Sequence, residues 1–499
     1  MKRILAVVLS LVLTVCLLSG CNENANNNSA QMDDFDGAYQ GFETGEGQSS
    51  ETTTNDEPVT SGETTTSIVS EASSMNEFVE LPSRIEYDSP TNFNLSEFKE
   101  GKRQIKVLQD ATAEDFKTYS AELLSKGFTK YDENKIADSL FMTLASRDTF
   151  VSISYMASDR KLKVVSEPLG DLYPRASDNK YKSLGLQSLF TGMKNQNKPI
   201  YSGMGFIIRL DDGSFIIIDG GGGDRNHIDS NNLLNILKEQ SPKGTDKPVI
   251  AAWIFTHCHD DHIGVFNAFS NDFHDKVEIK QIYYSFPMPK DILEHASYMF
   301  DDDYYSYPQF ENIIKNYYSN ADIIRPHSGE RYYIKNAVIE MLFTYDDHFP
   351  HSYEGGELGD LNTTSLIFTV EIGGQKMMIT GDAEESGMFK VLDNFGDHIK
   401  CDILQLSHHG QNGTVSFYSA VNPKYVLVPI SHVDTNRVYK NSANKWLVNN
   451  RKGDEFTVRQ FIAFWSGNVT IPLPYNPTDS QIYDRIPTAD TRYYDFQIN

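Results

Sequence analysis

The segment THCHDDHIG, residues 256–264, contains three histidines and two aspartates within six consecutive positions. Such a run is a poor core segment, because each buried polar group needs a partner. The apolar run VIAAWIF precedes it and the amphipathic run DHIGVFNAF follows it. The pattern therefore predicts a strand, a polar loop and a helix, with the loop displayed at the end of the strand.

Side chains of this loop are expected to point in two directions. His257 and His259 lie two residues apart, so their imidazoles project to the same side of an extended segment. Asp261 and His262 fall at the start of the predicted helix and face elsewhere. One loop can therefore serve two neighbouring metal ions, and its imidazoles and carboxylates suit Zn²⁺, Mn²⁺ or iron. A histidine-rich polar loop without metal is the alternative, which the flanking strand and helix disfavour.

Three other segments place polar side chains directly after predicted strands. Asp219 ends FIIID, Asp382 ends MMITGD, and His408 and His409 lie in LQLSHHG. Taken alone, Asp219 is equally well a turn residue, and Asp382 is more often a helix N-cap. It is their order along the chain, with Asp219 before the histidine motif and the other three residues after it, that favours one shared site.

From His257 to His262 the chain reads HxHxDH, which resembles the signature of the metallo-β-lactamase fold superfamily, and the later motifs follow in that family's order. The resemblance covers roughly the last three-fifths of the chain. It implies an α/β fold, an αββα sandwich of two mixed β-sheets with outer helices. It also implies that Asp219 supports the metal loop through hydrogen bonds from outside the ligand set.

The resemblance implies two divalent metal ions, with Zn²⁺ the first choice and Mn²⁺ or iron the alternatives. His257 and His259 are expected to bind one ion, with Asn362 as a weak amide ligand. Asp261 and His262 are expected to bind the other ion together with His408 or His409. Asp382 is expected to bridge the two ions. The histidine of the late pair that does not bind metal is expected to contact the leaving group or a bound phosphate.

One position departs from the common family pattern. Many members carry a histidine where this chain has Asn362, in GDLNTTSL. His348 or His351 would take that role only if its loop folded inward, so Asn362 is preferred. The resulting pattern, NxxSL…TGD…SHHG, resembles the hydrolase domain of ComEC-type competence proteins and is similar to that of phosphorylcholine esterases of teichoic acids.

The reaction class that this site implies is hydrolysis of an ester, phosphodiester or amide, with Asp261, Asp382 and His409 as catalytic residues. Water on a metal ion loses its proton near neutral pH, so a metal-bound hydroxide replaces a serine or cysteine nucleophile. The resemblance favours a phosphoester or phosphodiester substrate. It disfavours β-lactams, whose hydrolysis usually accompanies the missing histidine.

A competing hypothesis from another class is a non-catalytic surface receptor that retains the fold. Degenerate family members usually lose metal ligands first, and here nearly all are present, which favours an enzyme. A metal store is disfavoured because one buried site holds few ions. The net charge of −25 also gives no support to nucleic acid as the partner, although a local basic groove would permit it.

The N-terminal segment MKRILAVVLSLVLTVCLLSGC, residues 1–21, has the layout of a secretory signal. Leu18-Ser19-Gly20-Cys21 resembles the lipobox of bacterial lipoproteins, which implies a lipid anchor at Cys21 and a place on the outer face of the cytoplasmic membrane, at the bacterial cell surface. An uncleaved membrane anchor is the alternative. Residues 22–77 follow as an acidic linker rich in Ser, Thr and Asn, with too few apolar residues to fold.

The remaining sequence divides into three parts. Residues 78–170 predict a small α+β accessory module, with a helix in TAEDFKTYSAELLSKGF and strands in SLFMTLAS, FVSISYMA and KLKVVSE. Residues 182–474 form the predicted hydrolase domain, and residues 475–499 a C-terminal tail. We expect the accessory module to be a spacer or a partner contact, because none of its residues suggests chemistry.

Four smaller features complete the expectations. The tyrosine-rich insert 297–320 is interpreted as a helical cap packed on the core, with a lining of the substrate cleft as the alternative. Cys258 and Cys401 are expected to be free thiols, because two cysteines do not make a disulfide framework. Gln411 and Asn412 either contact substrate or close a loop. The oligomeric state has no signal in the sequence.

Overall fold

The computed structural model describes residues 95–100, 103–146, 149–168, 182–194, 204–222, 227–287, 296–298, 301–348, 359–429, 440–453, 455–464 and 467–478. The predicted signal, Cys21 and the linker lie outside these residues, as does His351. Within the described parts, no helix is both long and apolar enough to cross a bilayer. The described residues from Leu95 onward belong to one compact unit.

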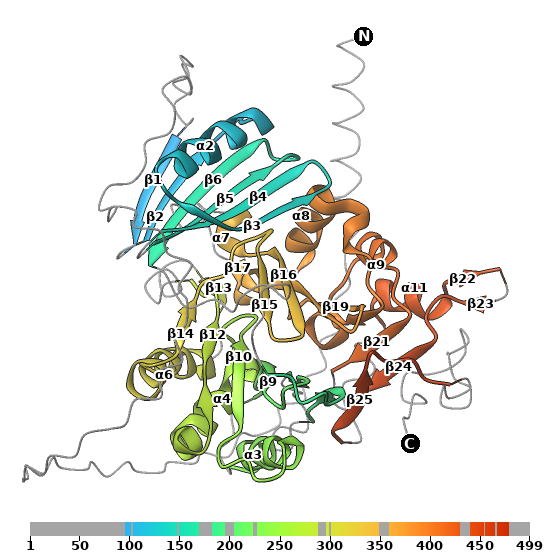
Figure 1. Cartoon of the computed structure of the whole chain (residues 1–499). Coiled ribbons are helices and arrows are strands. Elements are labelled where there is room, and N and C mark those ends of the chain that lie inside the picture. The colour runs from blue at the N-terminus through green and yellow to red at the C-terminus, as the bar shows by residue number, and fades with distance from the viewer. Residues whose placement is uncertain are drawn as a thin grey trace, which may run out of the picture. The chain divides into compact units, whose positions relative to one another are not determined.

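An antiparallel sheet with a helix on one face forms the N-terminal part (Figure 1). Its order is β1-β2-β6-β5-β4-β3, and its elements are β1 (Leu95–Glu100), β2 (Arg103–Leu108), α2 (Ala113–Ser125), β3 (Thr129–Ile136), β4 (Ser139–Ala145), β5 (Thr149–Met156) and β6 (Lys161–Pro168). Thr112 caps α2: its hydroxyl accepts from the Asp115 amide, and Asp115 accepts from the Thr112 amide in return. The helix and the three strands predicted from the sequence are therefore confirmed.

The first sheet of the larger domain mixes parallel and antiparallel strands. Its order is β14 (Asp322–Ile324), β12 (Gln281–Tyr283), β10 (Val249–Ile254), β9 (Phe215–Asp219), β8 (Gly205–Arg209), β7 (Ser188–Gly192) and β25 (Val469–Leu473), with the short β11 (Glu278–Ile279) also on β10. Strand β9 pairs in parallel with β10 and antiparallel with β8.

The second sheet is also mixed. Its order is β15 (Arg331–Ile334), β16 (Ala337–Phe343), β18 (Ile367–Ile372), β19 (Gln375–Ile379), β20 (Ile403–Gln405), β21 (Tyr425–Val428) and β24 (Gln460–Ala463). The strands from β15 to β19 are antiparallel, and those from β19 to β24 are parallel.

Alternating burial along the strands explains the layers. In β9, Ile216 and Ile218 belong to the core between the two sheets, whereas Phe215 and Ile217 belong to the core beneath the outer helices. Successive strand side chains point to opposite faces, so a strand that is apolar at every position is covered on both sides. The predicted αββα sandwich of two mixed sheets is thereby confirmed, with the antiparallel N-terminal sheet beside it.

Helices and short segments cover the sheets and carry the loops of the site. The helices are α3 (Ile228–Gln240), α4 (Asp260–Phe273), α6 (Asp301–Tyr317), α7 (Tyr345–His348), α8 (Glu385–Phe395), α9 (Val415–Val421) and α11 (Ser442–Asn449). The single turns are η3 (His274–Lys276), η4 (Leu361–Thr364), η5 (Gly396–Ile399) and η6 (Ser407–Gly410). Two short strand pairs remain, β13 (Ala296–Tyr298) with β17 (Gly359–Asp360), and β22 (Arg451–Lys452) with β23 (Glu455–Phe456).

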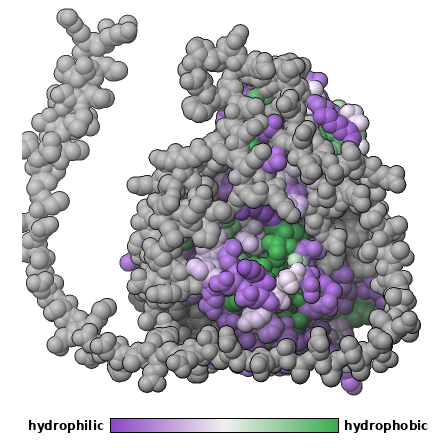
Figure 2. Space-filling model, turned by 90° about the vertical axis from the view of Figure 1, so that its left-hand side faces the viewer, coloured by the Kyte–Doolittle hydropathy of each residue, from purple (hydrophilic) through white to green (hydrophobic). Residues whose placement is uncertain are grey.

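The tyrosine-rich insert forms helix α6, which packs on α4. The ring of Phe310 lies 5.2 Å from that of Phe266, and Tyr307 and Tyr318 are buried. The described part of the insert therefore matches a helical cap packed on the core. Figure 2 shows a largely hydrophilic surface over the described residues on one face, with a small hydrophobic area between them.

The last described residues extend the domain beyond the predicted boundary at residue 474. Tyr475 is buried in the core between the sheets, and its backbone exchanges hydrogen bonds with the side chain of Gln375. Its hydroxyl donates to Gln460 at 2.7 Å. The residue at which we began a tail is therefore part of the sandwich.

The N-terminal sheet is attached to the larger domain by polar contacts. Arg331 forms two hydrogen bonds with Asp132, at 2.7 and 2.8 Å, and Asn134 donates to Glu340 at 2.9 Å. The spacer or partner role expected for this module stays a prediction, but the module is packed on the domain rather than merely tethered to it.

Candidate metal centre

The histidine motif forms a loop between β10 and α4, as its sequence predicts. His259 occupies the position before the first turn of α4, and Asp261 and His262 lie within that turn. Helix α4 can pass close to the end of β9 because Gly220 has no side chain: a Cβ atom at this glycine would lie 3.0 Å from the Phe266 nitrogen of α4. The loop is therefore held between two buried elements.

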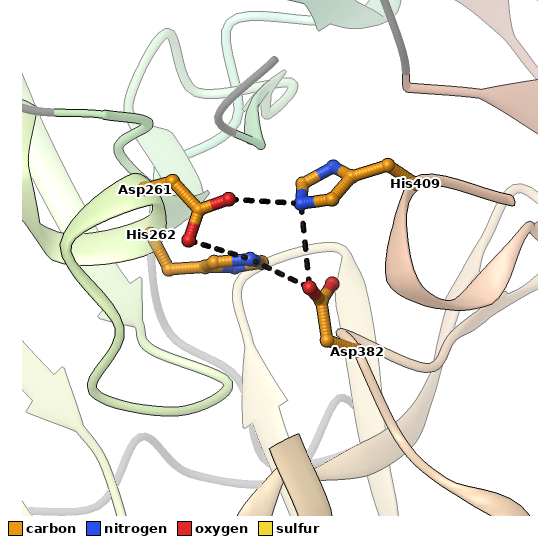
Figure 3. Close-up of side chains that lie close together, drawn as sticks. All are labelled: Asp261, His262, Asp382 and His409. Atoms are coloured by element: carbon orange, nitrogen blue, oxygen red, sulfur yellow. Dashed lines mark hydrogen bonds and ion pairs between the residues drawn. The ribbon is translucent and has the colours of Figure 1, made fainter. Parts of the chain in front are cut away.

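Four side chains from three separate segments converge beside this loop (Figure 3). One ligand atom from each of Asp261, His262, Asp382 and His409 lies within 4.8 Å of the others. His409 Nε2 is 3.0 Å from Asp261 Oδ2 and 3.3 Å from Asp382 Oδ2, and His262 Nε2 is also 3.3 Å from Asp382 Oδ2. We call these four residues the His/Asp cluster. No second group of this kind occurs among the described residues.

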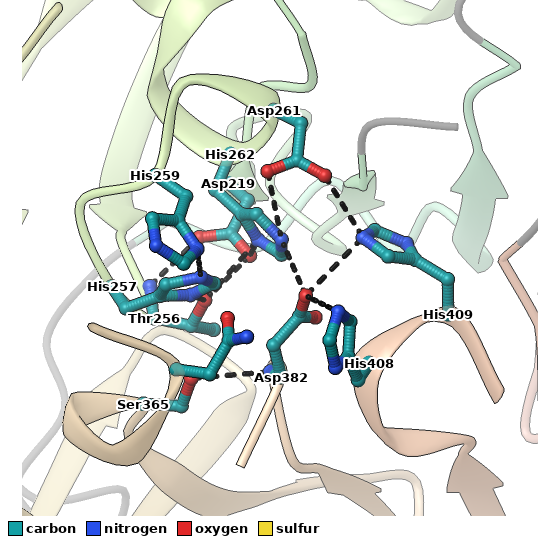
Figure 4. Close-up of polar contacts among 12 residues, drawn as sticks. Asp219, Thr256, His257, His259, Asp261, His262, Ser365, Asp382, His408 and His409 are labelled. Carbon is teal, nitrogen blue, oxygen red and sulfur yellow. Dashed lines mark hydrogen bonds and ion pairs between the residues drawn. The ribbon is translucent and has the colours of Figure 1, made fainter. Parts of the chain in front are cut away.

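A pair of imidazoles lies beside the cluster (Figure 4). His257 Nε2 faces His259 Nδ1 at 3.0 Å. The turn η4, which contains Asn362, is bracketed by two contacts with the site: Asp360 Oδ1 lies 3.6 Å from His259 Nε2, and Ser365 Oγ accepts from the Asp382 amide at 3.1 Å. The structure thus brings the predicted residues of the first metal position into the same region as the His/Asp cluster.

Asp219 orients the metal loop in the way the resemblance implied. This carboxylate is fully buried and accepts hydrogen bonds from the Thr256 amide at 2.7 Å, the Thr256 hydroxyl at 2.8 Å and His262 Nδ1 at 2.8 Å. Because His262 donates through Nδ1, Nε2 is the nitrogen that faces Asp382, and it could bind a metal ion that displaces its proton. Asp219 holds a left-handed backbone, with φ of 53°, to make these contacts.

Thr256 sets the orientation of His257 through a relay. Its hydroxyl gives its one hydrogen to Asp219, so it accepts from His257 Nδ1 at 3.1 Å. The His257 Nε2 lone pair then faces His259 Nδ1 at 3.0 Å, and it could bind a cation in place of that contact. Burial and the neighbouring imidazoles of His262 and His259 hold the pKa of His257 well below its usual value, so this ring is neutral, the form in which histidine binds metal.

The late histidine pair has two opposite orientations. Both residues adopt left-handed backbone angles, with φ of 50° at His408 and 54° at His409. His409 Nδ1 donates to the Pro429 carbonyl at 3.1 Å, so Nε2 is the nitrogen that faces the site, 3.0 Å from Asp261 Oδ2. His408 Nδ1 instead accepts from the Asn412 amide at 3.1 Å, so its proton is on Nε2. His409 therefore has the ligand orientation and His408 that of a hydrogen-bond donor.

Opposite charges dominate the electrostatics of the cluster. Burial alone would raise the pKa of Asp382, but His409, His262 and His408 together hold it well below its usual range. Burial likewise opposes the charge on His409, but the carboxylates of Asp382 and Asp261 raise its pKa to about 10. Imidazole protons thus supply the positive charge that the carboxylates require, and a metal ion would displace those protons.

The donor set fits a divalent cation such as Zn²⁺. His262 Nε2 and Asp382 Oδ1 are buried and have no hydrogen-bond partner, and the same is true of Asn362 Oδ1. Leaving such atoms without a partner costs free energy unless something else binds them. Imidazole nitrogens together with carboxylate oxygens are a common ligand set for Zn²⁺. The residues present are therefore compatible with the metal that the sequence implies.

The structure also shows where the other residues singled out in the sequence lie. His348 lies away from the cluster, with its ring stacked 5.0 Å from Phe343 and Nε2 3.3 Å from the Ser328 hydroxyl. Cys258 and Cys401 are buried and are not joined in a disulfide, as predicted. Asn412 orients His408, and the Gln411 carbonyl accepts from Asn441 at 3.0 Å, so neither contact requires a substrate.

Sequence reasoning missed the residues that act through others. Thr256 stands at the first position of the quoted motif and could have been noticed there, since a hydroxyl before a metal-binding histidine can orient it. The Pro429 carbonyl and the carboxylate of Asp360 left no signal, because they reach the site through tertiary contacts.

Comparison with known proteins agrees with the geometry. Residues 202–432 match the family model described as the Metallo-beta-lactamase superfamily. ComE operon protein 3 of Bacillus subtilis (strain 168) is 26% identical over 182 residues, which are 36% of this chain and 19% of that protein. Competence protein ComA of Neisseria gonorrhoeae is 33% identical over 70 residues, 14% of this chain and 10% of that protein. The alignments therefore span at most about a fifth of these relatives.

Solved structures with a similar fold include the metallo-beta-lactamase fold protein YhfI from Bacillus subtilis, at 13% identity and a TM-score of 0.34, covering 57% of this chain and 100% of that chain. Unliganded yeast PDE1 is 14% identical with a TM-score of 0.31, covering 49% of this chain and 88% of that chain. Residues 202–432 of this chain therefore form a metallo-beta-lactamase superfamily domain, with distant similarity to the competence proteins ComE operon protein 3 and ComA.

Proposed function

We propose that this protein is a metal-dependent hydrolase that acts on phosphoesters, with phosphodiesters as the first class to test. The observation that carries the proposal is the convergence of the His/Asp cluster, with ligand atoms within 4.8 Å of one another. The His257–His259 pair beside it supports a second ion. Two divalent ions, with Zn²⁺ the first choice, would then share Asp382.

When bound, divalent ions at this site would supply Lewis acidity and a lowered pKa for water. The chain's own residues would hold these ions and orient the side chains that bind them. Asp261, His262 and His409 would hold one ion, His257 and His259 with Asn362 the other, and Asp382 would lie between them. Asp219, Thr256 and the Pro429 carbonyl fix the rings from behind.

His408 is proposed to contact the substrate directly. Its Nε2 carries a proton, because Nδ1 accepts from Asn412. The ring is 28% exposed, and Nε2 lies 3.8 Å from Asp382 Oδ2. Burial lowers the pKa of His408, so the ring is neutral at pH 7. It can therefore donate a hydrogen bond to a phosphoryl oxygen or to the departing oxygen without adding a charge.

The preference for phosphoesters rests on the sequence pattern and on charge. Asn362 replaces a neutral imidazole, and the pattern NxxSL…TGD…SHHG is that of the competence-type branch. A phosphodiester keeps a negative charge, which suits a centre that contains two cations and a donor such as His408. Similarity to proteins named for competence is compatible with this class of substrate but does not identify it.

We also propose that the protein is anchored by lipid at Cys21 on the outer face of the cytoplasmic membrane. The support is the sequence alone: the apolar segment that ends in Leu18-Ser19-Gly20-Cys21. Cys21→Ser is expected to abolish incorporation of labelled fatty acid in the bacterial host and to leave an unprocessed N-terminus. Unchanged labelling of the variant would contradict the anchor.

The test of activity uses the full chain, purified in detergent and reconstituted with Zn²⁺. Turnover of bis(p-nitrophenyl) phosphate is compared with that of p-nitrophenyl phosphate and of a chromogenic β-lactam. We expect hydrolysis of the diester that a chelator abolishes and added metal restores. A folded protein that contains metal but does not hydrolyse any phosphoester would overturn the proposal and favour a receptor that retains the fold.

A further inference from the structure

One histidine of the site is oriented by a carboxylate that the sequence analysis did not identify. In His257, His262 and His409, a hydrogen bond at Nδ1 decides that Nε2 is the nitrogen directed into the site. For His257 the partner of Nδ1 is Thr256. His259 faces His257 through Nδ1, so its other nitrogen is Nε2. The acid nearest to that atom in the described contacts is Asp360, at 3.6 Å.

Asp360 is fixed by three contacts of its own. Its backbone is part of β17 and pairs with Tyr298 of β13 in the insert. Its Oδ1 atom accepts from the Asn362 amide at 3.0 Å, as the N-cap of η4, and its carbonyl accepts from the Thr363 hydroxyl at 2.7 Å. The oxygen that caps η4 is therefore also the oxygen that faces His259.

We infer that Asp360 is a positioning residue for the first metal position, where it orients His259 and Asn362 together. A carboxylate beside Nε2 favours a proton on that nitrogen, so that Nδ1, which lies 3.0 Å from His257 Nε2, could present its lone pair to a metal ion in place of that contact. The same oxygen holds the backbone of Asn362, whose buried Oδ1 has no hydrogen-bond partner. One side chain thus sets the direction of two ligands.

The inference gives a physical reason for the departure at Asn362. An amide oxygen is a weaker ligand for Zn²⁺ than an imidazole, so the position loses affinity when asparagine replaces histidine. The negative charge of Asp360, 3.6 Å from His259 Nε2, would strengthen His259 as a ligand and offset part of that loss. This reasoning rests on the metal centre of the proposed function, but not on the identity of the substrate.

The pairing of β17 with β13 also connects the insert to the metal. Tyr298 lies opposite Asp360 in this pair, and helix α6 follows three residues later, at Asp301. At the other end, the Ser306 hydroxyl of α6 donates to Asp260, the residue after His259. The insert therefore contacts both sides of the first metal position, which fixes where Asp360 stands.

The test measures metal binding, separately from activity, with three variants of the full chain. Asp360→Asn keeps an acceptor for the Asn362 amide but removes the charge beside His259, and Asp360→Ala removes both. Glu384→Gln is the matched control. Burial and the charge of Asp360 both raise the pKa of Glu384, so this acid is close to Asp360, but it has no described contact with a ligand.

Affinities for the two ions are measured by competition with a chromophoric chelator, and the Co²⁺-substituted protein is compared by its visible absorption. For Asp360→Asn we expect one position to lose affinity by about 10- to 100-fold, with an altered Co²⁺ spectrum, and the other to change by less than about twofold. Asp360→Ala should lose more, and Glu384→Gln should match the original chain.

Unchanged affinity in Asp360→Asn, an equal loss at both positions, or the same loss in Glu384→Gln would overturn the inference. The midpoint temperature of thermal unfolding of the metal-free variants shows whether the fold is intact. If Asp360 is a positioning residue, its substitution leaves this temperature nearly unchanged. If the original chain binds two ions as expected but does not hydrolyse phosphoesters, only the proposed function fails. Binding of a single ion by the original chain would contradict the inference itself.

Discussion

Two buried clusters of histidines and carboxylates among the described residues balance their charges differently. The His/Asp cluster contains His262 and Asp382, both almost fully buried. The second, which we call the interface cluster, consists of Lys163 from the N-terminal sheet with His327, Glu330 and Asp347, and its side chains are similarly buried.

The difference is a fixed positive charge. Lys163 Nζ donates to Asp347 Oδ1 at 2.7 Å, and Asp347 also accepts from the Ser328 amide at 2.7 Å and from His327 Nδ1 at 3.0 Å. The oxygens of Asp347 therefore have their partners within the protein. Lys163 and His327 hold the pKa of Asp347 well below its usual value in spite of its burial.

In the His/Asp cluster, the described ion pairs involve histidines only, and no lysine or arginine takes part in them. His262 Nε2 and Asp382 Oδ1 have no hydrogen-bond partner. Burial and charge alone therefore do not make a metal site. What distinguishes the His/Asp cluster is that its positive charge is exchangeable and that one ligand atom from each of its four residues lies within 4.8 Å of the others.

Removal of the shared carboxylate should have the largest effect. Asp382→Ala is expected to reduce phosphodiester hydrolysis to the background of the metal-free protein, because both ions lose a ligand at once. Metal content by mass spectrometry should fall in parallel. Asp347→Ala, in the interface cluster, is the control, and this variant protein should have the same metal content as the original chain. A metal-loaded Asp382→Ala protein with substantial turnover would contradict the role of Asp382.

Loss of the fixed charge should affect stability instead. Lys163→Met leaves Asp347 buried without its ammonium partner, which should destabilise the fold by about 3–5 kcal/mol in urea unfolding. Zinc affinity of the folded variant should not change, since Lys163 contacts no ligand in the described structure.

The double variant Lys163→Met/Asp347→Ala provides the control for this second prediction. It should recover part of the lost stability, because the uncompensated charge is gone. If the single variant were as stable as the original chain, the ion pair would not be holding the N-terminal sheet, and the contrast between the two clusters would weaken.

The late histidines should separate metal binding from turnover. His409→Ala is expected to lose the ion of the His/Asp cluster, whereas His408→Ala should keep both ions and lower kcat by about 100-fold. Metal content and kcat are measured for both variants. Equal metal loss in the two variants would show that their rings are not oriented as described.

The pH dependence of stability should reveal His327 in the interface cluster. Burial opposes the charge on this ring, but Asp347 and Glu167 outweigh it and raise its pKa to about 9, above the unfolded value of 6.5. The stabilising contribution is therefore complete below pH 6.5 and is lost as the pH rises through 9, by at most about 1.4 kcal/mol per pH unit.

His327→Gln is the comparison for that measurement. The difference in free energy of unfolding between the original chain and this variant should shrink from pH 6 to pH 9.5. A difference that stays constant over this range would mean that His327 is neutral in the folded protein. The metal-free protein is used at each pH, so that the titration of the ligands in metal binding does not contribute.

Local patterns in the sequence predicted the elements that depend on neighbouring residues. The capping box of Thr112 and Asp115 fixed the start of α2, and the apolar run before His257 predicted β10 and the loop after it. The two-residue spacing of His257 and His259 was enough to place both rings on one side. These features follow from backbone periodicity and from contacts within a few residues, so the sequence alone predicts them.

The sequence by itself determined the class of site: which residue types gather, in which order, and after which strands. Only the tertiary structure decided which histidine of the late pair has the ligand orientation, because that depends on the Pro429 carbonyl and the Asn412 amide. The same holds for Asp360, which lies a hundred residues from His259 in sequence and reaches it only through the folded chain. The hydrogen-bond partner of one ring nitrogen decides which nitrogen is left for a metal ion or a substrate, and the fold supplies that partner.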